Sequence, residues 1–151
     1  MHTLVRRFVK TAILFLGVGL ALGGWLIVRR ELQGLGADPY LVSAHTHALL
    51  VGFVMMMILG VALWLFPRPA KDDERYDPRA AEASYWILTI ATATRIAGEV
   101  GRFASEAVWL RWTVALAGLA QVAGIALFFW TMWRRIRPVG SHQREAKGER
   151  F

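Results

Sequence analysis

The strongest constraint on this chain is a long, strongly apolar stretch, residues 43–69, that carries almost no charge. His45 and His47 stand near its beginning. A helix from His45 to Phe66 would extend roughly 32 Å, which is enough to cross the ~30 Å hydrocarbon core of a bilayer. A ring that can ionise or bind metal is costly at membrane depth and indicates a functional position. The two histidines are therefore the first candidates for a site.

The composition extends this interpretation to the whole chain. Of its 151 residues 56% are hydrophobic, with seven Trp and eight Phe, which is too apolar for a soluble domain of this length. The absence of cysteine excludes disulfides, thiolate metal sites, iron–sulfur clusters and covalent haem attachment through C-x-x-C-H. The formal charge of +7 lies mostly in the tails and one loop, where it orients a membrane protein. We expect the lipid bilayer, and no nucleic acid, as a partner.

Four segments predict the fold class, an all-α integral membrane four-helix bundle formed by a single transmembrane domain. The predicted helices cover about residues 9–29, 41–66, 81–101 and 108–134. The third segment is the least apolar, so we expect it to turn its polar face into the bundle. Residues 138–151 form a polar tail that we expect to be disordered.

The distribution of Lys and Arg predicts the orientation. The amino terminus, the loop between the second and third helices and the carboxy tail carry more of these residues than the other two loops. Both termini are therefore expected in the cytoplasm, in a multi-pass protein of the cytoplasmic membrane. His45 and His47 would then face the outer leaflet. Arg95, Glu99 and Arg102 of the third segment reach the same leaflet.

The two histidines cannot act together on one ion. Residues two apart on a helix point roughly 200° away from each other, so His45 and His47 serve different faces. The ridge of His45 continues through Leu49 and Gly52, and a glycine leaves room for a flat ring or for a neighbouring helix. Three interpretations stay open at this point: a haem or metal ligand, an interfacial histidine bonded to water, and a proton relay.

A His-Thr pair at residues 45–46 opens the apolar, glycine-containing segment, which ends in the sequence WLFP at residues 64–67. With these features, residues 44–69 resemble the second helix of subunit I of the haem-copper oxidase superfamily. The likeness is greatest to the C-type cytochrome oxidases and nitric oxide reductases, where His-Thr-Asn opens that helix. The resemblance implies that His45 is an axial ligand of a low-spin haem b near the outer surface. His47 stands where the family has Asn, so the resemblance assigns it no role.

The complete reducing centre of that family needs further histidines on later helices, and beyond residue 47 this chain has only His142. One chain cannot build that centre, so enzyme activity stays an open question. The main hypothesis is a small membrane b-type haem protein, with low-spin or five-coordinate haem, that transfers electrons or binds a gaseous ligand in a respiratory chain. The expected cofactor-binding residues are His45, Gly52, Arg95 and Arg102. The two arginines would pair with haem propionates, although the spacing of Arg95 and Glu99 also predicts an ion pair between them.

Two other functions stay open. One is a non-catalytic interaction or assembly subunit of a respiratory complex, without haem. The other is a copper-binding protein that uses His47 and the thioethers of residues 55–57, because soft sulfur ligands favour Cu(I). The candidate metal ligands are therefore His45, for a haem iron, and His47, for copper.

A haem on His45 lacks a second axial ligand within the chain. We therefore expect a homo-oligomer in which a neighbouring copy completes the site, with a redox partner from the respiratory chain. Glycines let helices approach closely, and we expect the faces around Gly19, Gly23 and Gly52 to contact other copies.

Overall fold

The computed structural model describes residues 3–66, 77–136 and 147–148. Every element in this part of the chain is helical, which confirms the all-α fold class. The elements in chain order are α1 (Thr3–Ile27), the π-helix η1 (Val28–Leu32), α2 (Pro39–His47), the π-helix η2 (Ala48–Met55), α3 (Met56–Leu65), α4 (Pro78–Ala104), α5 (Val108–Met132) and the 3-10 helix η3 (Trp133–Arg135). The disordered tail expected over residues 138–151 lies outside the described residues, apart from a turn at 147–148.

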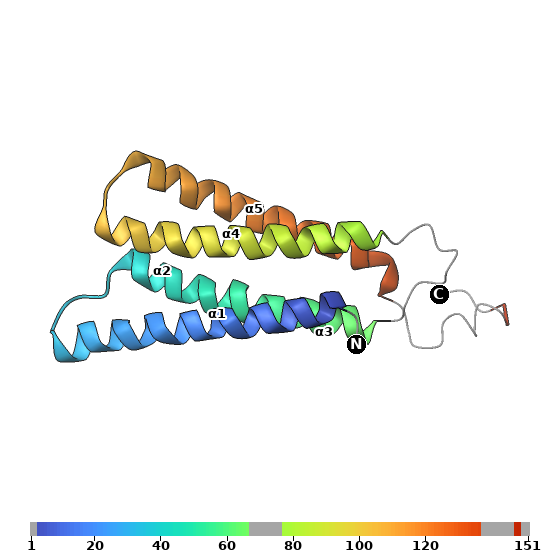
Figure 1. Cartoon of the computed structure of the whole chain (residues 1–151), viewed down its shortest axis with the longest axis horizontal. Coiled ribbons are helices and arrows are strands. Elements are labelled where there is room, and N and C mark those ends of the chain that lie inside the picture. The colour runs from blue at the N-terminus through green and yellow to red at the C-terminus, as the bar shows by residue number, and fades with distance from the viewer. Residues whose placement is uncertain (1–2, 67–76, 137–146, 149–151) are drawn as a thin grey trace.

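Two helical hairpins make up the bundle (Figure 1). In the first, α1 packs along α2, η2 and α3, which follow one another as a single rod. In the second, α4 packs along α5. The two hairpins meet mainly where α2 lies against α4. The chain begins α1 and ends α5 at the same end of the bundle, so the α4–α5 turn lies at the opposite end.

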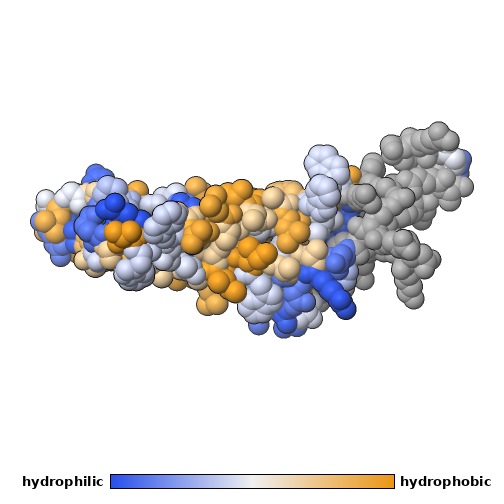
Figure 2. Space-filling view, turned by 90° about the horizontal axis from the view of Figure 1, so that it is seen from above, coloured by the Kyte–Doolittle hydropathy of each residue, from blue (hydrophilic) through white to orange (hydrophobic). Residues whose placement is uncertain are grey.

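Three of the helical segments are long and apolar enough to cross a membrane: Thr3–Leu32, Pro39–Leu65 and Val108–Met132. Apolar side chains gather in the middle of the molecule, between hydrophilic groups at both ends (Figure 2). The remaining helix, α4, is more polar, and its Ser84, Thr92 and Glu99 are buried. The expectation that this segment turns its polar face into the bundle is therefore confirmed.

An Asp-Pro pair begins each of two helices. Asp38 accepts two hydrogen bonds, of 2.9 and 3.2 Å, from backbone N–H groups in the first turn of α2, and Pro39 takes the first helical position. Asp77 and Pro78 do the same for α4, with a bond of 2.8 Å. Proline suits this position because its missing N–H would have no helical partner there. Both helices thus begin slightly earlier than the apolar pattern predicts, since that pattern does not include the cap.

Aromatic contacts join the two hairpins near both ends. At the end where α1 begins, the Phe8 ring meets the edges of Tyr85 on α4 and Phe128 on α5, with centroids 5.0 and 5.8 Å apart. At the other end, the rings of Trp25 and Phe103 lie 5.5 Å apart in an edge contact. These contacts fix α1 against the second hairpin at two levels, so the helix faces that lie between them are held in register.

Candidate functional site

His45 lies in the last turns of α2, and its ring packs against α1. Its Nδ1 is 2.8 Å from the backbone oxygen of Gly19. Because a carbonyl oxygen can only accept, Nδ1 donates this bond, and the neutral ring with this tautomer has its lone pair on Nε2. A hydrogen bond from the other ring nitrogen to a backbone oxygen is what orients a metal-ligating histidine and fixes its tautomer. His45 is therefore a residue that could hold a metal or haem iron through Nε2.

Gly23 makes room for this ring. A Cβ atom at position 23 would lie only 2.7 Å from Cε1 of His45 and 3.1 Å from its Nδ1. Any residue with a side chain would therefore push the ring away from α1. Gly23 and the oxygen of Gly19, one turn apart on α1, together form the seat of His45.

The glycine faces are occupied within the first hairpin. A Cβ at Gly19 would meet Leu49 at 2.4 Å, and one at Gly52 would meet Phe15 at 2.6 Å. The expectation that the faces of Gly19, Gly23 and Gly52 contact other copies is therefore wrong, because side chains of the same chain already fill them. Leu49 and Gly52 also turn toward α1 rather than toward the second hairpin. The role of Gly52 in binding a haem stays a prediction.

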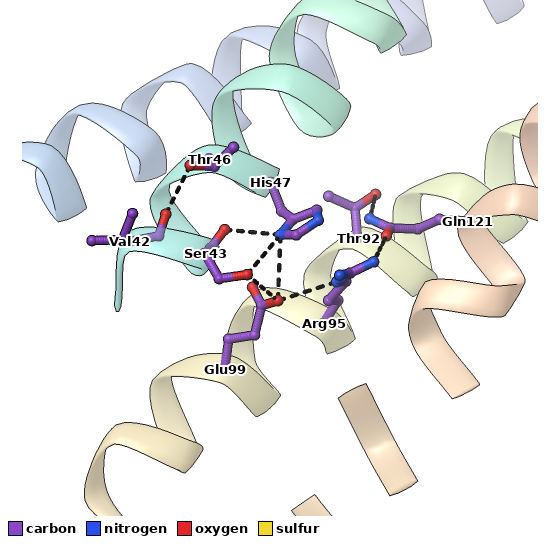
Figure 3. A network of polar contacts seen from close by, with 8 residues as sticks. All are labelled: Val42, Ser43, Thr46, His47, Thr92, Arg95, Glu99 and Gln121. Atoms are coloured by element: carbon purple, nitrogen blue, oxygen red, sulfur yellow. Dashed lines mark hydrogen bonds and ion pairs between the residues drawn. The ribbon is translucent and has the colours of Figure 1, made fainter. Parts of the chain in front are cut away.

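His47 points the other way, toward α4 (Figure 3). Its Nδ1 lies 2.8 Å from the backbone oxygen of Ser43 and 3.3 Å from Oε1 of Glu99. The hydroxyl of Ser43 donates to the same carboxylate oxygen at 2.7 Å. Oε1 of Glu99 thus contacts two side chains of α2, Ser43 and His47. The opposite directions of His45 and His47 are those that the helical spacing predicts.

Arg95 continues this network into the second hairpin. Its Nε donates to Oε1 of Glu99 at 3.1 Å, so the predicted ion pair is confirmed. Its Nη1 donates to the side-chain oxygen of Gln121 on α5 at 3.0 Å, and the amide nitrogen of Gln121 donates to the Thr92 hydroxyl. Glu99 is only 2% exposed. Arg95, which is 25% exposed, therefore neutralises the buried carboxylate, as a bilayer requires, and polar bonds connect α2, α4 and α5.

Arg102 of α4 faces the same side of α2 but has other partners. Its Nη2 donates to the Tyr40 hydroxyl at 2.6 Å, and the guanidinium carbon lies 4.7 Å from the centre of the Tyr40 ring. Glu106 is a weaker partner, with its carboxylate oxygen 3.5 Å from Nη2. The other terminal nitrogen, Nη1, is buried and has no partner among the described residues.

The structure does not bring all the candidate residues together. His45 contacts α1, on the opposite side of α2 from both arginines. Arg95 bonds to Glu99 and Gln121 in the second hairpin, and Arg102 bonds to Tyr40 at the start of α2. The pairing of either arginine with a haem propionate stays a prediction. In the described part of the chain, no group of three or more His, Asp and Glu side chains converges on a metal position. His45 and His47 also contact different helices, so they do not share an ion.

The interpretation of the sequence missed Ser43 and Tyr40. Ser43 lies one turn before His47, and that spacing on a helix is the signal that pairs them. Tyr40 reaches Arg102 across 62 positions of the chain, which no local pattern indicates.

A comparison with protein families extends the likeness beyond one helix. The profile described as cytochrome c and quinol oxidase polypeptide I matches residues 3–145, which include all four helices and both candidate histidines. Searches of curated proteins and of solved structures gave no match. The profile covers nearly the whole chain, so the resemblance to haem-copper oxidase subunit I is confirmed. This chain belongs to the cytochrome c and quinol oxidase polypeptide I family.

Proposed function

We propose that this protein is a small b-type haem protein of the cytoplasmic membrane that transfers electrons or binds a gaseous ligand in a respiratory chain. The observation that carries the proposal is the seat of His45, where the bond from Nδ1 to the Gly19 oxygen leaves Nε2 available as a ligand. The family match supports the choice of haem, because this family generally binds haem and copper. Within the family, the His-Thr pair at residues 45–46 supports the C-type oxidase and nitric oxide reductase branch.

The residues around His45 suit a haem ligand chemically, but they do not enclose a haem. A second chain would have to cover the rest of the macrocycle. The imidazole is oriented by its bond to Gly19 and is only partly buried, which suits an axial ligand. Leu49 and Phe15, however, fill the spaces beside Gly19 and Gly52. A macrocycle is therefore not accommodated between α1 and α2, and it needs cover from a second chain. When bound, its iron would supply electron transfer or gas binding.

The same chain also offers no second axial ligand opposite His45 among its described residues. His47 is turned toward Glu99, and Met56 is fully buried among the core side chains that surround α1. Neither is placed to face the ring of His45. We therefore include a symmetric homo-oligomer in the proposal, with a neighbouring residue completing the ligand pair, or an open position that takes the gas. The proposal also includes cytoplasmic termini, which the distribution of Lys and Arg favours, and a respiratory redox partner.

The test is haem binding by purified variants. His45→Ala should abolish or severely reduce the Soret absorbance while leaving membrane insertion intact, because the helix keeps its apolar length. His47→Asn is the matched control and should retain haem, since His47 contacts α4 rather than α1. Equal loss in both variants contradicts the assignment of His45. A colourless wild-type protein from haem-replete cells contradicts haem binding and leaves a non-catalytic interaction or assembly subunit.

A further inference from the structure

A cleft of about 590 Å³ opens beside Arg102. Figure 1 places the α4–α5 turn, next to Arg102, at the end of the bundle opposite the start of α1 and the end of α5. It lies where the start of α2, the end of α4 and the first turns of α5 meet. The residues lining it are Tyr40, Arg102, Glu106, Arg111, Val114 and Ala115. None of them contacts His45 in the described structure, so the cleft is separate from the seat of the proposed ligand.

The charged lining favours an anion. Two arginines share one carboxylate: Glu106 lies 3.5 Å from Arg102 and 3.2 Å from Arg111, and the Glu106 side chain is 81% exposed. The lining therefore carries a net positive charge, and its only carboxylate stands largely in solvent. Arg102, by contrast, is 7% exposed.

One buried nitrogen of Arg102, Nη1, lacks a hydrogen-bond acceptor among the described residues. The other terminal nitrogen, Nη2, is held by Tyr40. A buried donor without a partner is unfavourable, and more so when it is charged. The contact with the Tyr40 hydroxyl and ring holds the guanidinium in place, so binding an acceptor there orders little that is not already fixed.

The other side of the cleft is apolar. Val114 and Ala115 continue along α5 into the bilayer from Arg111, and they line the same cleft. Trp109 and Trp112 are exposed on the same part of α5. Exposed tryptophans are typical of the boundary between headgroups and hydrocarbon. The cleft thus combines a cationic end at headgroup level with an apolar end that is directed into the membrane.

We propose that this cleft binds an anionic phospholipid, with its phosphodiester at Arg102 and Arg111 and its acyl chain along Val114 and Ala115. Guanidinium groups match phosphate oxygens in geometry and form charge-assisted hydrogen bonds with them. The lipid would supply the acceptor that Nη1 lacks. A free phosphate ion shares the polar chemistry but leaves the apolar side uncovered, so the two sources are distinguishable.

Native mass spectrometry of the detergent-solubilised full chain tests this proposal. Phosphatidylglycerol should bind at least tenfold more tightly than phosphatidylcholine, and millimolar inorganic phosphate should not displace it. Arg102→Gln should weaken phosphatidylglycerol binding at least tenfold, and Arg111→Gln a few-fold. Arg30→Gln is the matched control and should change nothing, because Arg30 loses the same charge from a side chain that is 74% exposed and paired with Glu31.

Other outcomes overturn the proposal. Equal binding of the two lipids would show that the headgroup is not recognised, and displacement by inorganic phosphate would leave a small-anion site only. Exclusion of the lipid by bound haem would assign Arg102 to a propionate instead. If Arg102→Gln fails to fold, Arg102→Lys keeps the charge, and it should lose most of the selectivity because an ammonium cannot form the paired bonds of a guanidinium. Full selectivity in Arg102→Lys would contradict the proposed geometry.

Discussion

Replacing Gly23 with alanine tests whether the seat of His45 prepares a haem ligand. The added Cβ would lie 2.7 Å from Cε1 and 3.1 Å from Nδ1 of His45, whereas ordinary contacts begin near 3.4 Å. The ring must therefore move by about 0.7 Å, away from α1 and from the Gly19 oxygen to which Nδ1 is bonded. The ligand itself is unchanged, so the substitution perturbs only its orientation.

The expected magnitude follows from that hydrogen bond. Such a bond contributes about 0.5–1.5 kcal/mol net to stability. Losing the hydrogen-bond partner of a metal-bound histidine typically lowers metal affinity 10–100-fold. We expect the haem dissociation constant of Gly23→Ala to rise roughly 10–100-fold. The assay is a titration of the haem-free protein in detergent, followed at the Soret band. Circular dichroism checks that the helices remain.

Gly24→Ala provides the matched control. It adds the same methyl group to the neighbouring residue of α1, where a Cβ meets no atom within 4 Å. Alanine also favours helix over glycine by ~1 kcal/mol, so this variant should bind haem normally and be slightly more stable. Equal haem affinity in the two variants would refute the proposed role of the seat, and equal losses would show that the effect is not specific to His45.

Three further predictions concern the bundle, each measured as a thermal unfolding transition in detergent. Glu99→Gln should destabilise the protein by about 3 kcal/mol or more, because it leaves Arg95 without its buried carboxylate; adding Arg95→Leu should recover part of the loss, and strictly additive losses would contradict the pairing. Phe8→Ala should cost about 3–5 kcal/mol, because Phe8 is fully buried between two aromatic rings, whereas Phe103→Ala should cost less since its ring is only partly buried. Asp38→Ala should cost about 0.5–2 kcal/mol by removing the cap of α2, and an unchanged transition would show that the cap contributes nothing measurable.

Much of the architecture follows from local properties of the sequence. The uncharged runs fix the number of apolar segments, because each must bury its length in lipid. The four-residue spacing of Arg95 and Glu99 is enough to predict their ion pair. The opposite directions of His45 and His47 follow from the same helical geometry. The second predicted helix alone indicates the family, because it begins with His-Thr at residues 45–46 and ends in the aromatic sequence WLFP at residues 64–67.

The remaining features depend on contacts between distant segments. The glycine spaces at Gly19 and Gly52 suit a flat ring, a neighbouring copy or a side chain of the same chain equally well, and only the folded hairpin shows Leu49 and Phe15 in them. The contact of Tyr40 with Arg102 requires knowing that α2 lies against α4. The π-helix η2 also escapes prediction, because the apolar residues of 48–55 carry no periodic pattern that separates wide turns from ordinary ones.

That π-helix has a consequence for how the chain tolerates changes in length. A π turn closes its hydrogen bond one residue later than an α turn, so it stores an extra residue inside an otherwise continuous rod. Deleting one residue within η2 would convert a wide turn into an ordinary one and leave the contacts of α2 and α3 with α1 largely in place. The same deletion in α4 would rotate everything beyond it by roughly 100°. Homologous chains should therefore vary in length directly after His47 and keep a constant length between Arg95 and Arg102.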